Sequence, residues 1–416
     1  MANNFSAATV DWATAQALRL LLNKLSVAEA FNTDYGKDYQ MDFPVGATIR
    51  VPLPQRWLIR DGLGYSPQPI NRINTTITVD QVFGIDFQMD SVERALQQIR
   101  NEQEVARLFM ESPMAKLAQE IDSRASLWGY QNTNNIVGIL GTNPTSMQTY
   151  NQARQRLVEL AGAAGQKRMI ISPGMQVALG NAVATVFNPA PTITSIFKEG
   201  ALLGAQGAAG FNDWYESMSL YQHTSGTWAG AVTVNLSGQS GSTLNVTCTT
   251  NDTFLAGDIF NIGLVNATNP ETNRSTGTLK QFRVVQNATG AASAAALTID
   301  PPIIGPGSQY QNVDALPVNG QALTLFPGTT SPNGKTGVNG MAFSRDAFAL
   351  VGVKLEEPKG SVEYCKVQRD PQTGIAVRYL KQFLGQPSIM IERFDVLLGF
   401  GNLYNDNCAV RVLGQS

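Results

Sequence analysis

Residues 47–80 of the chain read ATIRVPLPQRWLIRDGLGYSPQPINRINTTITVD. Residues 47–51 and 74–80 alternate between apolar and polar side chains, so we predict a strand at each place. The segment between them, 52–73, is called the extended loop below. Loops of that length are usually functional or disordered. Because residues 57–59 are Trp, Leu and Ile, we expect this loop to lie on another surface.

The segments on either side of this stretch predict helices. Residues 8–31 have an apolar side that includes Leu20 and Leu21 and predict an amphipathic helix. A helix that stands alone near a terminus has to dock on another element or on another chain. Residues 85–130 are expected to be mostly helical, with a long two-faced helix starting at Ser112. We interpret this helix as a backbone on which sheets pack.

Residues 150–220 predict an alternation of helix and strand, which is typical of an α/β or α+β layer. The expected elements are helices at 151–164 and 175–187 and a strand at 168–171.

Residues 222–338 differ in composition, because only nine of these 117 residues are charged. Short alternating segments recur in them and predict a small β-barrel or sandwich. The expected strands are 232–236, 244–248, 259–264, 281–285 and 323–325. Since mixed patterns return after this region, we expect it to be inserted into a host domain.

The composition indicates either a surface of low charge or a surface that other chains largely cover. Of the 416 residues, 43% are apolar and 15% are charged, and the formal net charge is −2. Globular domains average about 25% charged residues, and the cores of protein interfaces are depleted of charge. A net charge this close to zero argues against a broad basic face that would bind nucleic acid.

The histidine and cysteine content limits the chemistry. His223 is the single histidine, so a histidine-based triad would depend on it, and zinc sites with several imidazoles are excluded. Its place at the edge of 222–338 predicts a surface or hinge residue. The cysteines, Cys248, Cys365 and Cys408, are far apart in the sequence and predict thiols in a reducing compartment. We therefore predict no catalytic, cofactor-binding or metal site.

The N-terminus lacks the basic region of a signal peptide, and no apolar run approaches the roughly 20 residues of a membrane span. We expect a soluble chain that is made inside the cell and has no membrane partner.

One set of motifs resembles the serine enzymes that react with penicillin. Ser195 and Lys198 have the S-x-x-K spacing, and S-x-N and K-T-G follow at 331–333 and 335–337. The last two motifs would have to face each other across a cleft, but one residue separates them. We also expect no strand after Lys335 to present it. A serine acyltransferase is therefore an alternative that we discount.

Several stretches, taken in order, carry a resemblance to a known family. They are GATIRVPLP at 46–54, GDIFNIGLV at 257–265, LKQFRV at 279–284, DPPI at 300–303 and MAFSRDAF at 341–348. With these stretches, the chain resembles the major capsid (coat) proteins of tailed double-stranded-DNA bacteriophages, which have the Hong Kong 97 fold. More closely, it resembles the gene-five coat proteins of podoviruses, which carry an insertion domain. The resemblance implies an α+β fold with an inserted small antiparallel β-barrel.

The same resemblance implies a division of the chain into the parts of that fold. They are an N-terminal arm (1–36), the extended loop with its flanking strands (37–90), the spine helix of a peripheral domain (91–131), the first part of an axial domain (132–221), the inserted barrel (222–338), the axial return (339–365) and the C-terminal strands (366–416).

The function that the resemblance implies is structural and not enzymatic. Copies would assemble as pentamers and hexamers into an icosahedral procapsid, which encloses double-stranded DNA without sequence-specific binding and then expands. A separate scaffolding protein and a portal would be partners, and the chain would be located in the virion capsid after assembly in the host cytoplasm. The alternative is a β-rich decoration or receptor-binding protein of a virion, with 222–338 as its binding module.

A shell protein works through its surfaces, so the candidate functional residues are contacts and hinges. We predict contacts between subunits at Leu20, Leu21, Arg56, Trp57, Leu58, Ile59 and Arg60. The two arginines are expected to meet carboxylates of the adjacent subunit. Because one chain must fit several environments in a shell, hinges are also required. The candidates are Gly62, Gly64 and Gly84.

Overall fold

The computed structural model describes residues 5–35, 48–60, 62–65, 67–70, 73–90, 111–161, 165–184, 211–228, 230–325, 334–358, 364–385, 389–403 and 408–415. The chain divides into two compact units. The first consists of Met1–Val51, Asn74–Ala125 and Phe348–Leu403, and the second of Pro52–Ile73, Ser126–Ala347 and Tyr404–Ser416. Both units combine helices with sheets, which confirms the predicted α+β class.

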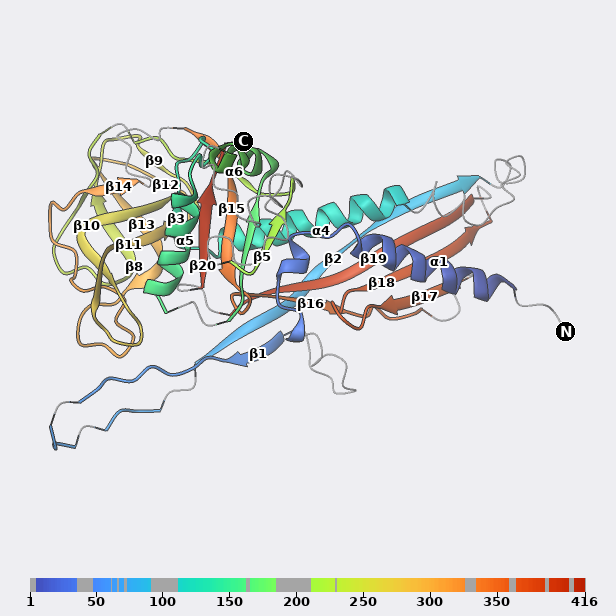
Figure 1. The fold of residues 1–416 in the computed structure, drawn as a ribbon, viewed down its shortest axis with the longest axis horizontal. Coiled ribbons are helices and arrows are strands. Elements are labelled where there is room, and N and C mark those ends of the chain that lie inside the picture. Colours follow the sequence, from blue (N-terminus) through green and yellow to red (C-terminus); the bar gives the residue numbers. More distant parts are fainter. Residues whose placement is uncertain are drawn as a thin grey trace. The chain divides into compact units, whose positions relative to one another are not determined.

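A six-stranded sheet lies at the centre of the first unit. Its strands follow the order β1-β2-β19-β18-β17, and β16 also pairs with β19. The longest strands, β2 (Asn74–Asp90) and β19 (Ile389–Asn402), are antiparallel and run side by side in Figure 1. The others are β1 (Thr48–Pro52), β16 (Phe348–Val353), β17 (Tyr364–Arg369) and β18 (Ala376–Leu384).

Strand β2 continues further than we predicted. Residues 85–90 belong to it, so the mostly helical stretch that we predicted at 85–130 does not begin at residue 85. Phe83, Ile85 and Phe87 are half-buried, whereas the residues between them are exposed, which is the period of two of a strand. The buried side faces α4 (Glu111–Gln131), because the Arg124 guanidinium lies 4.2 Å from the centre of the Phe83 ring.

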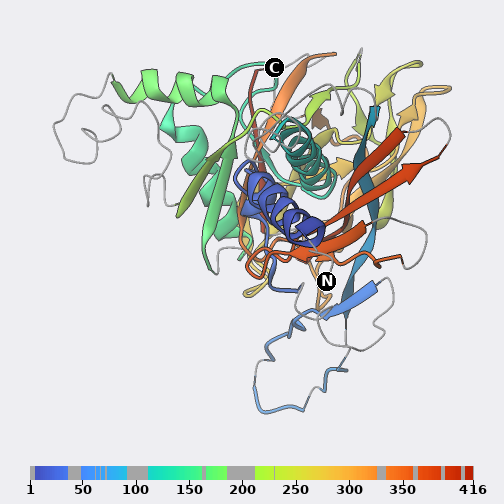
Figure 2. The same cartoon turned by 90° about the vertical axis from the view of Figure 1, so that its right-hand side faces the viewer.

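Two helical segments of the N-terminal arm belong to the first unit. The helix α1 (Phe5–Leu22) ends earlier than the predicted 8–31 and is followed by the short 3₁₀ helix η1 (Ala28–Ala30). In Figure 2, α1 is seen nearly end on next to α4. Helix α1 contacts β17 and β18, so the arm docks on its own chain. The helix that we predicted before residue 111 lies outside the described residues.

One carboxylate ties the arm to α4. The buried oxygens of Asp122 accept hydrogen bonds from the backbone N–H groups of Ser26, Val27 and Ala28 and from the Ser26 hydroxyl, at 2.8 to 3.1 Å. Because these N–H groups lie at the start of η1, Asp122 acts as a helix cap that a distant helix supplies. Burial raises the pKa of the Asp122 carboxyl, against the lowering effect of these hydrogen bonds.

The second unit contains another six-stranded sheet, in the order β3-β20-β15-β4-β5, with β6 paired to β15. Helices α5 (Met147–Glu159) and α6 (Pro173–Ala184) pack on it through one apolar core, which includes Tyr150, Leu179 and Val410. The strands are β3 (Ile136–Val137), β4 (Lys167–Ile171), β5 (Asp213–Glu216), β6 (Gln222–Thr224), β15 (Thr336–Ser344) and β20 (Ala409–Leu413). The elements predicted at 151–164, 168–171 and 175–187 are thus confirmed within the described residues, with shifted ends.

Between β6 and β15 the chain forms a third six-stranded sheet, in the order β14-β10-β11-β13-β8-β7. Thr233 of β7 bridges to Ala322 beside β14, and this contact brings the two edge strands together, so the sheet closes. We call residues 232–325 the barrel. Its strands are β7 (Thr233–Val234), β8 (Gly241–Thr247), β10 (Ile259–Thr268), β11 (Ser275–Val284), β13 (Ala294–Ile303) and β14 (Leu323–Leu325), and a separate pair joins β9 (Thr253–Phe254) to β12 (Ala288–Thr289).

The strand β15 corrects a second prediction. It starts at Thr336, directly after Lys335, where we expected no strand. Its residues Thr336 to Val338 pair with β6. The glycines at 337 and 340 hide the strand in the sequence, because glycine has a low strand propensity.

The raised pKa of Asp122 predicts a pH dependence of stability. A carboxyl whose pKa is higher in the folded chain binds its proton more tightly there, so its contribution to the free energy of unfolding falls as the pH rises from about 3.9 through the folded pKa. The variant Asp122→Asn lacks this contribution. In urea unfolding at a series of pH values, the stability of the parent minus that of the variant should fall across this window and then stay constant. A difference that is independent of pH would contradict the raised pKa.

A second prediction concerns Gly84 in the middle of β2. A Cβ atom at this position would lie 2.2 Å from the Phe394 carbonyl oxygen and 2.5 Å from an oxygen of the Asp395 carboxylate. Gly84→Ala should therefore lower the free energy of unfolding by about 1–3 kcal/mol, as overpacking does. Gly64→Ala is the matched control, because nothing lies within 4 Å of a Cβ atom there. Equal stabilities of the two variants in chemical denaturation would refute the close approach.

Candidate functional site

The extended loop presents large apolar side chains to solvent. The exposed fractions are 52% for Trp57, 90% for Ile59, 100% for Leu63, 90% for Tyr65 and 78% for Ile70. Scattered single exposures are normal on a soluble protein, whereas a group of this kind marks an interaction site. The loop is therefore the first candidate functional site, and two of the predicted contact residues, Trp57 and Ile59, lie at its surface.

Hydrogen bonds between the two halves of the loop hold it as a narrow ribbon. The side chain of Gln68 accepts from the Leu58 N–H at 2.9 Å and donates to the Leu58 carbonyl at 2.6 Å. Gln55 donates through its side-chain amide to the Pro69 carbonyl at 2.7 Å. Leu58, another predicted contact, is therefore half-buried within the ribbon and fixed there by Gln68.

Both predicted arginines have partners in their own chain. At the tip of the loop, Arg60 donates to the carbonyl oxygens of Gly62, at 2.7 Å, and of Gly64. At the base, the Arg56 guanidinium lies 6.0 Å from the centre of the Tyr310 ring, on the barrel. A carboxylate of a second copy as their partner stays a prediction.

The predicted hinge glycines have different surroundings. Gly62 has φ of +79°, a conformation that side chains other than glycine rarely adopt, so the turn at the tip requires it. Gly64 has open space around it, and Gly84 is required by the close approach of β19. The role of these glycines as hinges between shell environments stays a prediction.

The arm residues are less available than the loop. Leu21 is completely buried and Leu20 is half-buried within the first unit. The arm therefore covers these side chains with its own chain. A contact of Leu20 and Leu21 with a neighbouring subunit stays a prediction, and it would require α1 to move.

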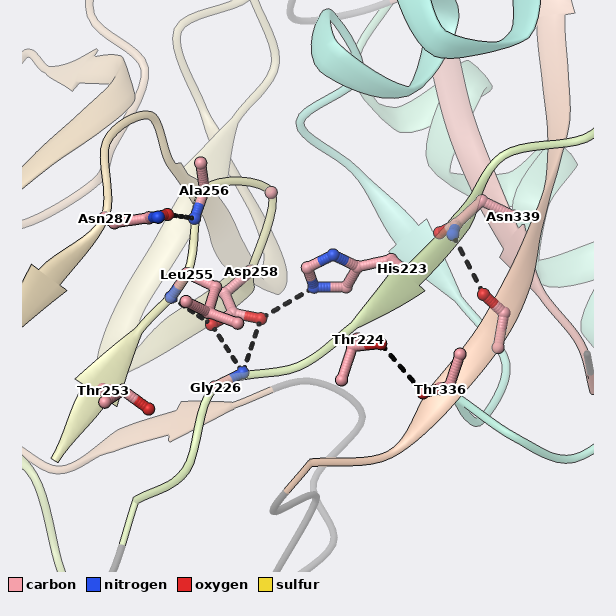
Figure 3. A network of polar contacts seen from close by, with 12 residues as sticks. His223, Thr224, Gly226, Thr253, Leu255, Ala256, Asp258, Asn287, Thr336 and Asn339 are labelled. Carbon is pink, nitrogen blue, oxygen red and sulfur yellow. Dashed lines mark hydrogen bonds and ion pairs between the residues drawn. The ribbon is translucent and has the colours of Figure 1, made fainter. Parts of the chain in front are cut away.

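A second candidate site lies where the chain passes from β6 toward the barrel, and Figure 3 shows it. His223 is buried, and its Nε2 lies 2.8 Å from Oδ1 of Asp258 while its Nδ1 lies 2.6 Å from the Tyr130 hydroxyl. Because a carboxylate can only accept, the ring donates from Nε2 to Asp258, and its other nitrogen shares a hydrogen bond with the Tyr130 hydroxyl. The prediction of a surface residue at His223 was therefore wrong, since burial here is offset by two hydrogen bonds.

Asp258 also accepts hydrogen bonds from the surrounding backbone. Its oxygens accept from the N–H of Gly226 at 3.1 Å and from the N–H of Leu255 at 2.8 Å. It thus joins the strand end at His223, the turn before β10 and the segment that enters the barrel. We call His223, Tyr130 and Asp258 the neck cluster.

A buried arginine lies against the neck cluster. Arg411 of β20 is fully buried, and its Nη1 donates to the Gly257 carbonyl at 2.8 Å. Its guanidinium lies 4.2 Å from the centre of the Tyr130 ring, within the range of a cation–π interaction. Burial lowers the pKa of Arg411 to about 10 and raises the pKa of the Tyr130 hydroxyl to about 12. Both groups therefore keep their usual charges near neutral pH.

Further polar contacts join the barrel to the sheet of the second unit. Arg283 of β11 donates to Asn134, in the segment before β3, at 2.8 Å, and Asn134 donates to Asp300 of the barrel at 2.9 Å. Gln281 exchanges two hydrogen bonds with the backbone of Ile136, at 2.8 and 3.1 Å. A buried polar network of this kind favours one relative arrangement, because any other would leave its groups unpaired.

No group of three His, Cys, Asp or Glu side chains in the described ranges is placed to hold a metal ion. None of the helices found there has the length and hydropathy to cross a membrane. The serine and lysine of the S-x-x-K motif, Ser195 and Lys198, lie outside the described residues, as does 331–333.

Comparisons with known proteins find structural similarity without sequence similarity. No family model and no curated protein matches the chain. A solved structure from Mycobacterium phage Che8 matches at 12% identity and a TM-score of 0.41, covering 93% of this chain and 90% of that one. The capsid structure of the cyanophage P-SCSP1u matches at 12% identity and a TM-score of 0.41, covering 89% and 84%. The CUS-3 coat protein I-domain matches at 23% identity and a TM-score of 0.19, covering 23% of this chain and 95% of that domain.

The neck cluster generates a prediction about stability. Tyr130→Phe removes the hydroxyl that contacts His223 and the Ala256 carbonyl, so a buried ring nitrogen loses its partner. We expect the free energy of unfolding to fall by about 1–3 kcal/mol in urea denaturation. The control is Tyr150→Phe in the same unit, since the buried Tyr150 hydroxyl has no hydrogen-bond partner among the described residues. That variant should be as stable as the parent, and a Tyr130→Phe variant equal to it would show that the cluster contributes nothing.

Phage capsid structures are thus among the solved structures that the chain resembles over most of its length.

Proposed function

We propose that the chain is the major capsid protein of a tailed double-stranded-DNA phage. Copies assemble as pentamers and hexamers into an icosahedral shell that encloses the genome, first as a procapsid that later expands. In this proposal the fold is of the Hong Kong 97 type, with residues 222–338 as an inserted domain. The chain is a structural protein and has no catalytic role.

The observation that carries the proposal is the exposure of the extended loop. Ile59, Leu63 and Tyr65 are each at least 90% exposed. Burying such a side chain in an interface would contribute about 1.5–3 kcal/mol of hydrophobic free energy. Their own chain does not cover them, so a second copy is the occupant that the proposal names. A projecting loop on one copy and an acceptor surface on the next make a heterologous contact, which closes into rings when it repeats around an axis.

The composition supports a surface that is largely interface. Only 15% of the residues are charged, against about 25% in globular domains. In a shell, each copy contacts several neighbours, and charged side chains are depleted where contacts are buried. The low charge is therefore expected for a shell subunit and unusual for a free monomer.

The parts of the chain take on roles within this proposal. Residues 1–36 form an arm, 37–90 contain the extended loop, and 91–131 contain the spine helix. Residues 132–221 and 339–365 form the axial domain, and 366–416 supply the C-terminal strands of the peripheral and axial domains. Its partners are other copies of itself, a separate scaffolding protein, a portal and the packaged DNA, to which it binds without reading sequence. Assembly takes place in the host cytoplasm and the product is the virion capsid.

Charges placed on the loop should prevent assembly without unfolding the subunit. In Ile59→Asp with Leu63→Asp, both side chains are already exposed, so the unfolding free energy should change by less than about 0.5 kcal/mol. We expect closed shells from the parent, expressed with a scaffolding protein, and none from the variant, by light scattering and negative-stain imaging. The conservative variant Ile59→Val with Leu63→Met should still form shells.

Two outcomes would overturn the proposal. A parent chain that stays a stable single copy at high concentration would remove the capsid function. A small oligomer that binds a preformed shell or a glycan would support the decoration or receptor-binding alternative instead.

A further inference from the structure

The base of the extended loop is in contact with the barrel of the same chain. The Gln309 side-chain amide donates a hydrogen bond to the Arg56 carbonyl. The next residue, Tyr310, places its ring 6.0 Å from the Arg56 guanidinium. We propose that the barrel segment 304–312 is a brace that holds the extended loop of its own chain in a preset orientation for contact with a second copy.

The brace segment is itself stiff, which it must be to orient another segment. The side chain of Asn312 accepts from the Ile304 N–H at 2.9 Å and donates to the Pro302 carbonyl at 2.7 Å. The backbone of Asn312 also donates to the Ile304 carbonyl at 3.1 Å. A short loop closed in this way at its base gives Gln309 and Tyr310, at its tip, a fixed position on the barrel.

The barrel in turn is anchored to the sheet of the second unit. The neck cluster, Arg411, Arg283 and Gln281 make the buried polar contacts described above. A further contact comes from α5, where the Glu159 carboxylate accepts from the Thr278 hydroxyl at 2.9 Å and Arg156 donates to the Leu279 carbonyl at 3.1 Å. Because the barrel is held at several separate points, it cannot turn without breaking most of them, and the brace is fixed with it.

Hydrogen bonds within the loop explain why a brace is useful. The bonds of Gln55, Gln68 and Arg60 join loop residues to one another, so they stiffen the ribbon without setting its direction. The contacts at Arg56 add that direction. An oriented loop loses less conformational entropy when it docks, which favours association. This inference extends the proposed function, and the role of the brace in assembly rests on that function.

The nature of the two contacts decides which variants test the brace. The Tyr310 hydroxyl is buried and has no hydrogen-bond partner among the described residues, so only the ring of Tyr310 contributes. Tyr310→Ala with Gln309→Ala removes both contacts to Arg56. Tyr310→Phe keeps the ring and is the matched control, and Gln286→Ala removes an exposed glutamine elsewhere on the barrel.

The test is hydrogen exchange of the full-length, unassembled chain, read by mass spectrometry. Peptides that cover residues 54–70 should exchange roughly five- to tenfold faster in the Tyr310→Ala, Gln309→Ala variant, since a cation–π contact and a hydrogen bond are lost. Tyr310→Phe and Gln286→Ala should match the parent. Peptides from β8, β11 and β13 report whether the barrel itself stays folded, and they should be unchanged in all variants.

The outcomes separate the brace from the proposed function. Unchanged exchange at 54–70 in the double variant, with an intact barrel, overturns the brace whether or not shells form. Equal acceleration by Tyr310→Phe also overturns it, because the hydroxyl would then be the contact that matters. If exchange accelerates and the parent forms no shells, the brace stands and the capsid function fails. If exchange accelerates in the double variant and the parent forms shells, the double variant should assemble more slowly than Tyr310→Phe.

Discussion

The buried carboxylate of Asp258 is the acceptor on which the connection between sheet and barrel depends. The two strands that lead to and from the barrel, β6 and β15, pair over only three residues, Thr224 to Gln222 with Thr336 to Val338. So short a ribbon cannot by itself hold a domain of about a hundred residues in one orientation. Asp258 adds a constraint at this point, because it accepts from His223, Gly226 and Leu255 at once.

The surrounding charges make this constraint specific. Arg411 is fully buried, and two of its nitrogens, Nε and Nη2, have no hydrogen-bond partner among the described residues. Burial of a cation costs free energy unless partners compensate it, and here the Gly257 carbonyl, the Tyr130 ring and the nearby Asp258 provide that compensation. An apolar contact would tolerate sliding, whereas the Gly257, Tyr130 and Asp258 contacts of Arg411 require one arrangement. The barrel therefore behaves as part of its unit, as the division of the chain indicates.

The extended loop differs from the neck cluster, because its apolar side chains are exposed and not buried. Ordinary loops carry polar residues, but here Ile59 and Leu63 are almost fully in water. The chain tolerates this because the two units bury their own cores independently of the loop. Hydrogen bonds within the loop pair the N–H and the carbonyl of Leu58 with the Gln68 side chain. Association with another surface would therefore be favourable, because it would remove these apolar side chains from water.

The period of apolar residues predicted most elements of the second unit, including α5, β4 and β10, because local patterns determine which segments form. It failed where patterns were short or mixed: at 85–90, which we included in a mostly helical stretch, and at β13, whose alanines carry little strand signal. It identified Trp57 and Ile59 as surface residues of the loop, but it did not identify Gln309 and Tyr310 as neighbours of Arg56. Nor did it show that Leu21 would be buried.

What the sequence by itself determined is therefore the set of segments, the low charge and the apolar character of the loop, since these depend on residues close together in the chain. Only the tertiary structure decided that the single histidine is buried between Tyr130 and Asp258, 93 and 35 residues away from it. The same holds for Asp122 and the arm, and for Arg56 and the barrel. The physical reason is that hydrogen bonds and charges act over a few ångströms, and the fold alone brings such distant residues within that range.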